Sequence, residues 1–215
     1  MSGSGGGGGG AGCLDGSDGG ISDGGPLVCS GPGARFVTDV VSLCLGDNPT
    51  FPTSALPGLA AGPPKGGGCC SGSTDVIPLG NGGSIIVAFE GNGIVDGPGP
   101  DFIVFENAFE IGGDPQKPFA ELATVAVSDD GATWVSFPCA ATMSPYGSCA
   151  GWRTVNANVD TNQIDPLDPQ VAGGDPFDLA DLGVKQARFV RITDRPDMPS
   201  DFDLDAVGIV NALCP

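Results

Sequence analysis

Acidic residues border the apolar runs of this sequence, and this placement suggests where its chemistry could lie. The stretch from 94 to 109, IVDGPGPDFIVFENAF, places Asp96, Asp101 and Glu106 among two apolar runs. Calcium takes six to eight oxygen ligands, and glycine lets loop carbonyls turn toward such an ion. We therefore predict a Ca²⁺ site, because without a cation several buried carboxylates would repel one another. The alternative is that Asp96 and Asp101 are solvated turn residues that cap local amides.

A second acidic stretch, DFDLDAVG at 201–208, has aspartate at three alternate positions. Alternate residues of a strand share a face, so the three carboxylates would either surround a shared ion or line an exposed edge. An EF-hand loop is excluded, because Ala206 stands where glycine is required and no Glu occupies the twelfth position. We predict Asp205 as a ligand, with Asp203 beside it, because the apolar run begins directly after Asp205.

The same acids could instead act in hydrolysis. Paired carboxylates are the catalytic groups of most glycosidases, and Glu106, Glu110 and Glu121 lie close together in the sequence. However, the chain has no histidine to serve as a general base, and it has no nucleophile elbow or phosphate-binding loop. We therefore predict that the protein is not an enzyme, and we keep as a rival a hydrolase that uses acidic residues near 101–121.

The best candidate for a ligand-binding surface is the segment SPYGSCAGWRTV at 144–155. Tyr146, Trp152 and Arg153 cluster there, and aromatic and arginine side chains are typical of interface anchors and sugar-stacking sites. We predict that these three residues bind a glycan or a protein ligand. The alternative, for Trp152 above all, is packing of the segment on its own domain.

The charge of the chain limits its partners. Eight Lys and Arg residues stand against 26 Asp and Glu residues, which gives a formal net charge of −18 at pH 7. Nucleic acids need cationic contacts to their phosphates, so no nucleic-acid partner is expected, and binding to anionic lipid is disfavoured. No stretch is long and apolar enough to predict a transmembrane span.

Eight cysteines in a loop-rich chain predict disulfides, and hence an oxidising compartment. Cys139 and Cys149 flank a short loop and are the first-choice pair. Adjacent Cys69 and Cys70 are expected to bond to different partners, because a vicinal bridge is strained. The segment AGC that ends at Cys13 looks like the end of a lipoprotein cleavage box. Cys13 would carry a lipid if a signal preceded this chain; otherwise it is expected to be a disulfide or a disordered thiol.

Short apolar runs broken by turn residues predict an all-β fold. Gly (38) and Pro (20) are abundant, no long window shows helical spacing of apolar residues, and a DDG turn between β-forming residues predicts a hairpin at 123–137. We predict a single β-sandwich or jelly roll at 35–214 with long Gly/Pro-rich loops, after a flexible Gly-rich tether at 1–34. Other strands are expected within 34–45, 75–79, 84–90, 101–107, 187–193 and 202–213, and a helical turn or two around 177–183.

The segments SDDGATW, ARFVRI and FDLDAVGIV resemble, in this order, the hairpin and closing strands of discoidin-like (galactose-binding-like) jelly rolls. LGNGGSIIVAF, DGPGPDFIVFENAF, AGGDPFDLADLGV and FDLDAV are similar to bacterial proteins usually called cell-surface proteins or lipoproteins. In discoidin-like domains calcium lies near one end of the sandwich, so the resemblance implies Asp96, Asp101 and Asp205 as ligands, with residues 138–176 as an insertion.

Together these observations predict an extracellular or cell-surface β-sandwich that is stabilised by Ca²⁺ and serves binding or adhesion, with glycans as one class of ligand. The rival is a structural subunit of a surface layer or extracellular filament, in which the sandwich associates with copies of itself. The predicted metal ligands are Asp96, Asp101, Glu106, Asp203 and Asp205.

Overall fold

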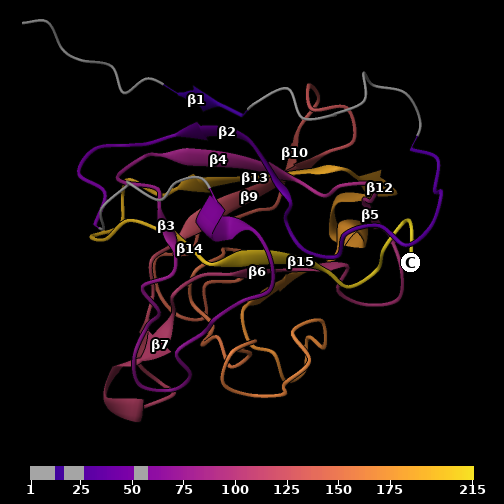
Figure 1. The fold of residues 1–215 in the computed structure, drawn as a ribbon. Coiled ribbons are helices and arrows are strands. Elements are labelled where there is room, and N and C mark those ends of the chain that lie inside the picture. Colours follow the sequence, from indigo (N-terminus) through magenta and orange to yellow (C-terminus); the bar gives the residue numbers. More distant parts are fainter. Residues whose placement is uncertain (1–12, 17–26, 51–57) are drawn as a thin grey trace, which may run out of the picture.

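The predicted all-β class is confirmed by the computed structural model, which describes residues 13–16, 27–50 and 58–215 (Figure 1). Within those ranges the only helical elements are short 3-10 turns. The strands are β1 (Leu14–Asp15), β2 (Asp39–Cys44), β3 (Ile77–Pro78), β4 (Ser84–Ala88), β5 (Ile94–Val95), β6 (Phe102–Phe105), β7 (Phe109–Glu110), β8 (Pro118–Phe119), β9 (Ala123–Ser128), β10 (Val135–Ser136), β11 (Asp175–Phe177), β12 (Gln186–Ala187), β13 (Phe189–Asp194), β14 (Asp203–Leu204) and β15 (Ala206–Ile209), and the 3-10 turns are η1 (Gly58–Ala60), η2 (Ile111–Gly113) and η3 (Leu179–Leu182).

Two antiparallel sheets form the layers of a sandwich (Figure 1). The larger sheet has the order β1-β2-β4-β13-β9-β10, and the smaller one has the order β11-β6-β15. The main core contains buried side chains from both sheets, and Phe102 of β6 lies at its centre, with ring centroids 5.2 Å from Phe177 and 6.0 Å from Phe137. Burial of these large apolar side chains is the main contribution to the stability of the sandwich.

The smaller sheet is buried on both faces, which explains why all four residues of β6 are apolar. Phe102 and Val104 point into the main core, whereas Ile103 and Phe105 pack in a second core. The second core includes Val155, Ala157 and Ala172 from the segment 138–176, which resembled an insertion in the sequence. This segment therefore covers the outer face of the smaller sheet.

The predicted hairpin at 123–137 is present as β9 and β10, with Val135 opposite Val127. Asp130 closes its turn, because its carboxylate accepts hydrogen bonds from the backbone N–H groups of Ala132 and Thr133 at 2.8 and 2.7 Å. The helical turn expected around 177–183 is the 3-10 turn η3.

All eight cysteines form disulfides, which indicates an oxidising compartment. The structure joins Cys139 to Cys149, the pair favoured by the sequence. The expectation that Cys69 and Cys70 bond to different partners is wrong, since they bond to each other. The reason is that the other six cysteines are already paired; the two further bridges are Cys13–Cys44 and Cys29–Cys214.

The disulfide of Cys13 also bears on the predicted lipid and tether. Its sulfur is bonded to Cys44, so the lipid considered for this residue does not fit the described structure. Residues 13–16 of the predicted tether contribute β1, which pairs with β2 at the edge of the larger sheet, while residues 1–12 and 17–26 lie outside the described ranges. Among the described residues, no helix is long and apolar enough to cross a membrane.

Candidate metal centre

The structure separates the predicted metal ligands into two groups of carboxylates. In each group, one ligand atom from every residue lies within 4.8 Å of the others. We call the first group the loop acidic cluster, and it consists of Asp96, Asp101 and Asp178. We call the second group the inner acidic cluster, and it consists of Glu106, Glu121 and Asp203.

The carboxylates of the loop acidic cluster already have protein partners. Asp101 is fully buried, and its two oxygens accept hydrogen bonds from the Leu179 and Gly97 backbone N–H groups at 2.7 and 2.8 Å and from the Asn211 side chain at 2.8 Å. Asp96 pairs with Lys185 at 2.5 Å. These donors satisfy the carboxylate oxygens without a cation.

Asp178 has a different structural role in the same cluster. It is the N-cap of η3, and its carboxylate accepts a hydrogen bond from the Ala180 N–H at 2.9 Å. Aspartate is favoured at this position because it accepts from an N–H group that the helical turn leaves without a partner. The loop acidic cluster thus joins the 96–101 loop to the start of η3 through backbone amides.

The inner acidic cluster lies where three separate segments meet. Glu106 directly follows β6, Glu121 lies two residues before β9, and Asp203 is the first residue of β14. All three are buried, with exposed fractions of 1%, 5% and 2%. Each of these acids adjoins buried apolar residues, such as Phe105, Leu122 and Leu204.

The inner acidic cluster also holds oxygen atoms that lack partners in the described structure. Both carboxylate oxygens of Glu106, one oxygen of Asp203 and the side-chain oxygen of the neighbouring Asn107 are buried without a hydrogen bond. Native proteins leave few buried polar atoms unsatisfied, and each one needs an explanation such as a bound ion or water. Four such atoms in one place point to a missing partner that attracts oxygen.

The electrostatics of the inner acidic cluster agree with this. Burial raises the pKa of Glu121 to about 7, and burial together with the charge of Glu121 raises the pKa of Asp203 to about 8. Burial, and then the charge of Glu121, also raise the pKa of Glu106 well above its usual range. Without a cation, the cluster would therefore hold protons near neutral pH, whereas a bound cation would replace them.

The geometry suits a hard metal ion. Calcium–oxygen distances are 2.3–2.6 Å, so two oxygens on one ion lie at most about 5 Å apart, and the separation of 4.8 Å satisfies this limit. Glu106, Glu121 and Asp203 would hold the ion, and the side-chain oxygen of Asn107 could add a neutral ligand. Zinc and copper favour imidazole or thiolate ligands, but the chain has no histidine and no free cysteine.

Asp205 lies in neither cluster. It is buried, and one of its carboxylate oxygens accepts a hydrogen bond from the Lys65 backbone N–H at 2.8 Å. Burial raises its pKa to about 7. The five predicted ligands therefore do not surround one ion: Asp96 and Asp101 are together, Glu106 and Asp203 are together, and Asp205 is separate.

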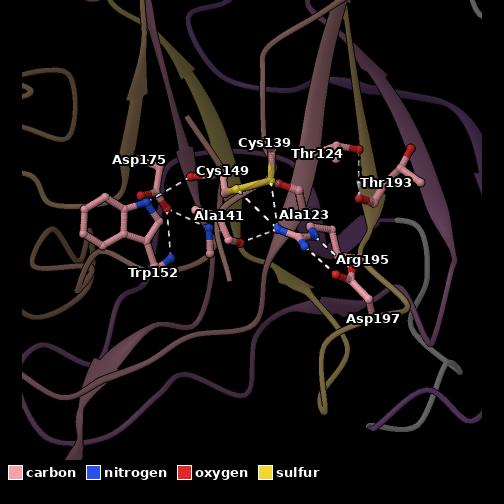
Figure 2. The surroundings of a disulfide bond; sticks show 11 residues. Ala123, Thr124, Cys139, Ala141, Cys149, Trp152, Asp175, Thr193, Arg195 and Asp197 are labelled. Carbon is pink, nitrogen blue, oxygen red and sulfur yellow. Dashed lines mark hydrogen bonds and ion pairs between the residues drawn. A yellow bond between two sulfur atoms is a disulfide. The ribbon is translucent and has the colours of Figure 1, made fainter. Parts of the chain in front are cut away.

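Of the predicted ligand-binding residues, Trp152 lies near the Cys139–Cys149 disulfide (Figure 2), and Tyr146 and Arg153 contact its ring. The guanidinium carbon of Arg153 lies 4.9 Å from the centroid of the Trp152 ring, and the Tyr146 ring meets the Trp152 ring edge-on at 5.9 Å. The Trp152 indole N–H donates to the Cys149 carbonyl at 3.1 Å, which fixes the ring.

Two members of the clusters were not predicted as metal ligands. Glu121 was considered only as a catalytic acid, although it directly precedes the buried run that contains β9, just as Glu106 follows the buried run of β6. Asp178 lies just before a helical turn, which signals a cap, but the sequence does not show that this turn lies against the 96–101 loop.

Comparisons of this chain with protein-family models, with curated proteins and with solved structures find no match.

Proposed function

We propose that this protein is a secreted or cell-surface β-sandwich that serves binding or adhesion and is stabilised by a Ca²⁺ ion at the inner acidic cluster. The observation that carries the proposal is the set of buried, unpartnered oxygens on Glu106, Asn107 and Asp203. An acidic cluster alone would not be sufficient, because exposed acidic groups are common. Here the acids are buried, and in the described structure both oxygens of Glu106 and one oxygen of Asp203 have no hydrogen-bond partner.

A structural role for the ion follows from its position. It would join the end of β6, the segment before β9 and the start of β14, which are more than ten residues apart in the sequence. Calcium supplies a divalent charge that offsets the mutual repulsion of the three carboxylates. The burial of Glu106 and Glu121 supports this role over hydrolysis, since a polymeric substrate needs access to both acids.

The extracellular part of the proposal is supported by the four disulfides and the acidic surface. Disulfides persist in oxidising compartments, and calcium is a common ligand of extracellular modules, whose affinities extend to weak binding. The group of Tyr146, Trp152 and Arg153 offers the surface at which a ligand could bind.

Thermal unfolding of the oxidised protein in calcium and in EGTA tests the proposal. A ligand at 100 times its dissociation constant stabilises the native state by about 2.7 kcal/mol, so calcium should raise the midpoint by about 5–10 °C. Because Glu106→Gln removes a charged ligand, this variant should lose most of the shift.

The matched control is Asp178→Asn, which makes the same change of acid to amide in the loop acidic cluster. This variant should keep the calcium shift. An equal shift in the Glu106→Gln variant and the wild type would contradict the assignment of the site, and no shift in a wild type shown to be metal-free beforehand would contradict the proposal itself.

A further inference from the structure

Arg153 carries a cationic group that the protein itself leaves largely unused. Its side chain is 47% exposed, and its only ion pair within the described ranges is with Asp175, at 3.8 Å. Among the described residues, its guanidinium donates no side-chain hydrogen bond, although arginine has five N–H donors in a planar fork that matches a carboxylate. Stacking on Trp152 holds this fork in place.

The chemistry around Arg153 fits an acidic sugar. A carboxylate can take the arginine fork in a bidentate pair, and the rings of Trp152 and Tyr146 lie next to it as apolar surfaces for a sugar ring. The indole N–H is used internally by the Cys149 carbonyl, so the ring contributes its face or edge and not a hydrogen bond. Because the chain has a net charge of −18, an anionic ligand needs a local cationic group such as Arg153 to bind.

The segment that contains Arg153 is joined by backbone hydrogen bonds to the segment that contains Glu121 of the inner acidic cluster. The Glu121 N–H donates to the Gly151 carbonyl at 2.9 Å, and Ala123 and Ala150 exchange two backbone hydrogen bonds at 3.1 and 3.0 Å. Gly151 has φ +91°, and a Cβ there would lie 1.9 Å from the Glu121 carbonyl oxygen, so only glycine fits. Gly151, which directly precedes Trp152, therefore contacts the backbone of Glu121, and Glu121 would hold the metal.

A buried carboxylate fixes the other side of this segment (Figure 2). One oxygen of Asp175 accepts hydrogen bonds from the Gly151 and Trp152 N–H groups at 2.7 and 3.2 Å. Its second oxygen has no hydrogen-bond partner and is the one that faces Arg153 at 3.8 Å. The backbone that carries Arg153 is thus held by Asp175 on one side and by the Glu121 segment on the other.

We propose that Arg153, stacked on Trp152 beside Tyr146, binds the carboxylate of an acidic sugar, and that a cation at the inner acidic cluster holds this site in its binding arrangement. The inference rests on the proposed cation site and names the class of ligand. Loss of the cation would release the Glu121 segment, and the backbone bonds to Gly151 would carry the displacement to Trp152 and Arg153.

The test is binding of a tetrasaccharide of alternating glucuronate and N-acetylglucosamine, measured by calorimetry in calcium. A neutral N-acetylglucosamine tetrasaccharide and a peptide with a free C-terminal carboxylate are the comparison ligands. The acidic sugar should bind at least ten-fold more tightly than either. Arg153→Ala should weaken it at least ten-fold and Arg153→Lys several-fold, because lysine keeps the charge but loses the fork.

A matched control is Lys117→Ala, which removes one exposed cation far along the chain from this site and should leave binding unchanged. Equal binding of the neutral sugar, or tight binding of the peptide alone, would overturn the assignment of the ligand. Equal losses in the Lys117→Ala and Arg153→Ala variants would show that general charge, and not the fork, drives binding.

The link to the cation is tested with the Glu106→Gln variant. This variant disrupts the proposed cation site, so all samples can contain the same calcium concentration. This variant should bind the acidic sugar at least five-fold more weakly, and in a Trp134→Phe background calcium should change the fluorescence of Trp152, the one remaining tryptophan. Calcium binding without either effect would overturn the link alone, whereas a wild type that binds no calcium would contradict the proposed cation site.

Discussion

The two acidic clusters contain the same kind of side chain at the same spacing, but they differ in what surrounds the oxygens. In the loop acidic cluster, Asp101 is buried and accepts three hydrogen bonds, while Asp96 faces Lys185. In the inner acidic cluster, both oxygens of Glu106 are buried and have no hydrogen-bond partner in the part of the chain that the structure describes. The protein itself supplies partners for the carboxylates of the loop acidic cluster, whereas the inner acidic cluster lacks a partner for its charge.

The comparison shows that acidic residues near one another do not define a metal site. A carboxylate that accepts backbone N–H groups is stabilised in its ionised form by the protein alone. A carboxylate that is buried without donors must either hold a proton or bind a cation. The two clusters therefore differ in how many of their carboxylate oxygens have hydrogen-bond or ion-pair partners. Substitutions in each cluster can test this difference.

The largest effect is expected at Asp101 in the loop acidic cluster. Asp101→Ala would leave several buried donors unpaired, at a cost of about 3–5 kcal/mol, and would lower the unfolding midpoint by about 10 °C. Asp101→Asn, which keeps one oxygen, should cost less. The loss should be equal in calcium and in EGTA when measured by thermal denaturation. A loss confined to calcium would show that this cluster holds the ion.

For Glu106→Gln, little loss or even a gain of stability is expected when calcium is absent. The change removes a buried charge or the proton that neutralises it, so the free energy of unfolding in EGTA should stay within about 1 kcal/mol of the wild type or rise. Urea denaturation of the metal-free proteins measures it. A loss as large as that of Asp101→Ala would mean that Glu106 has a protein partner of its own.

The pH dependence of the metal-free protein should show a further contrast. Folded Glu121 and Asp203 have pKa values of about 7 and 8, whereas unfolded carboxyl groups titrate near 4. Between these values the folded state binds more protons than the unfolded state, so stability should fall as pH rises from about 5 to 8. Denaturation across this range, with Glu106→Gln/Asp203→Asn for comparison, measures the slope, which the double variant should reduce. A midpoint that rises with pH would contradict this account.

The smallest effect is expected for Lys185→Ala. Lys185 is 84% exposed on its side chain and pairs with Asp96, and exposed ion pairs contribute about 0–1 kcal/mol. Urea denaturation should therefore show a loss close to the error of the measurement, reduced further in high salt. A larger loss that calcium restores would instead indicate that the loop acidic cluster needs a cation.

The sequence predicted the all-β class and most strand positions because alternation and turn residues are local signals. The hairpin at 123–137 is an example, since its DDG turn and flanking β-formers lie within one segment. The order of strands in the sheets was not predicted, because pairs such as β6 with β15 join residues about a hundred positions apart.

The grouping of the candidate site residues follows the same rule. Asp96 and Asp101 were grouped correctly as close neighbours in one loop, but their joining with Asp203 and Asp205 in a single ligand set required long-range contacts that the structure does not make. Glu121 becomes a partner of Glu106 only through the packing of β9 and β6 in different sheets. The unpartnered oxygens, on which the proposed function depends, cannot be seen in a sequence.

The most direct test of the central claim is the amount of calcium that each protein retains after dialysis against a low calcium concentration, measured by elemental analysis. The account predicts one calcium ion per chain in the wild type and in Asp96→Asn/Asp178→Asn, and none in Glu106→Gln/Asp203→Asn. Calcium that is retained by Glu106→Gln/Asp203→Asn and lost by Asp96→Asn/Asp178→Asn would contradict the account, and would assign the ion to the loop acidic cluster.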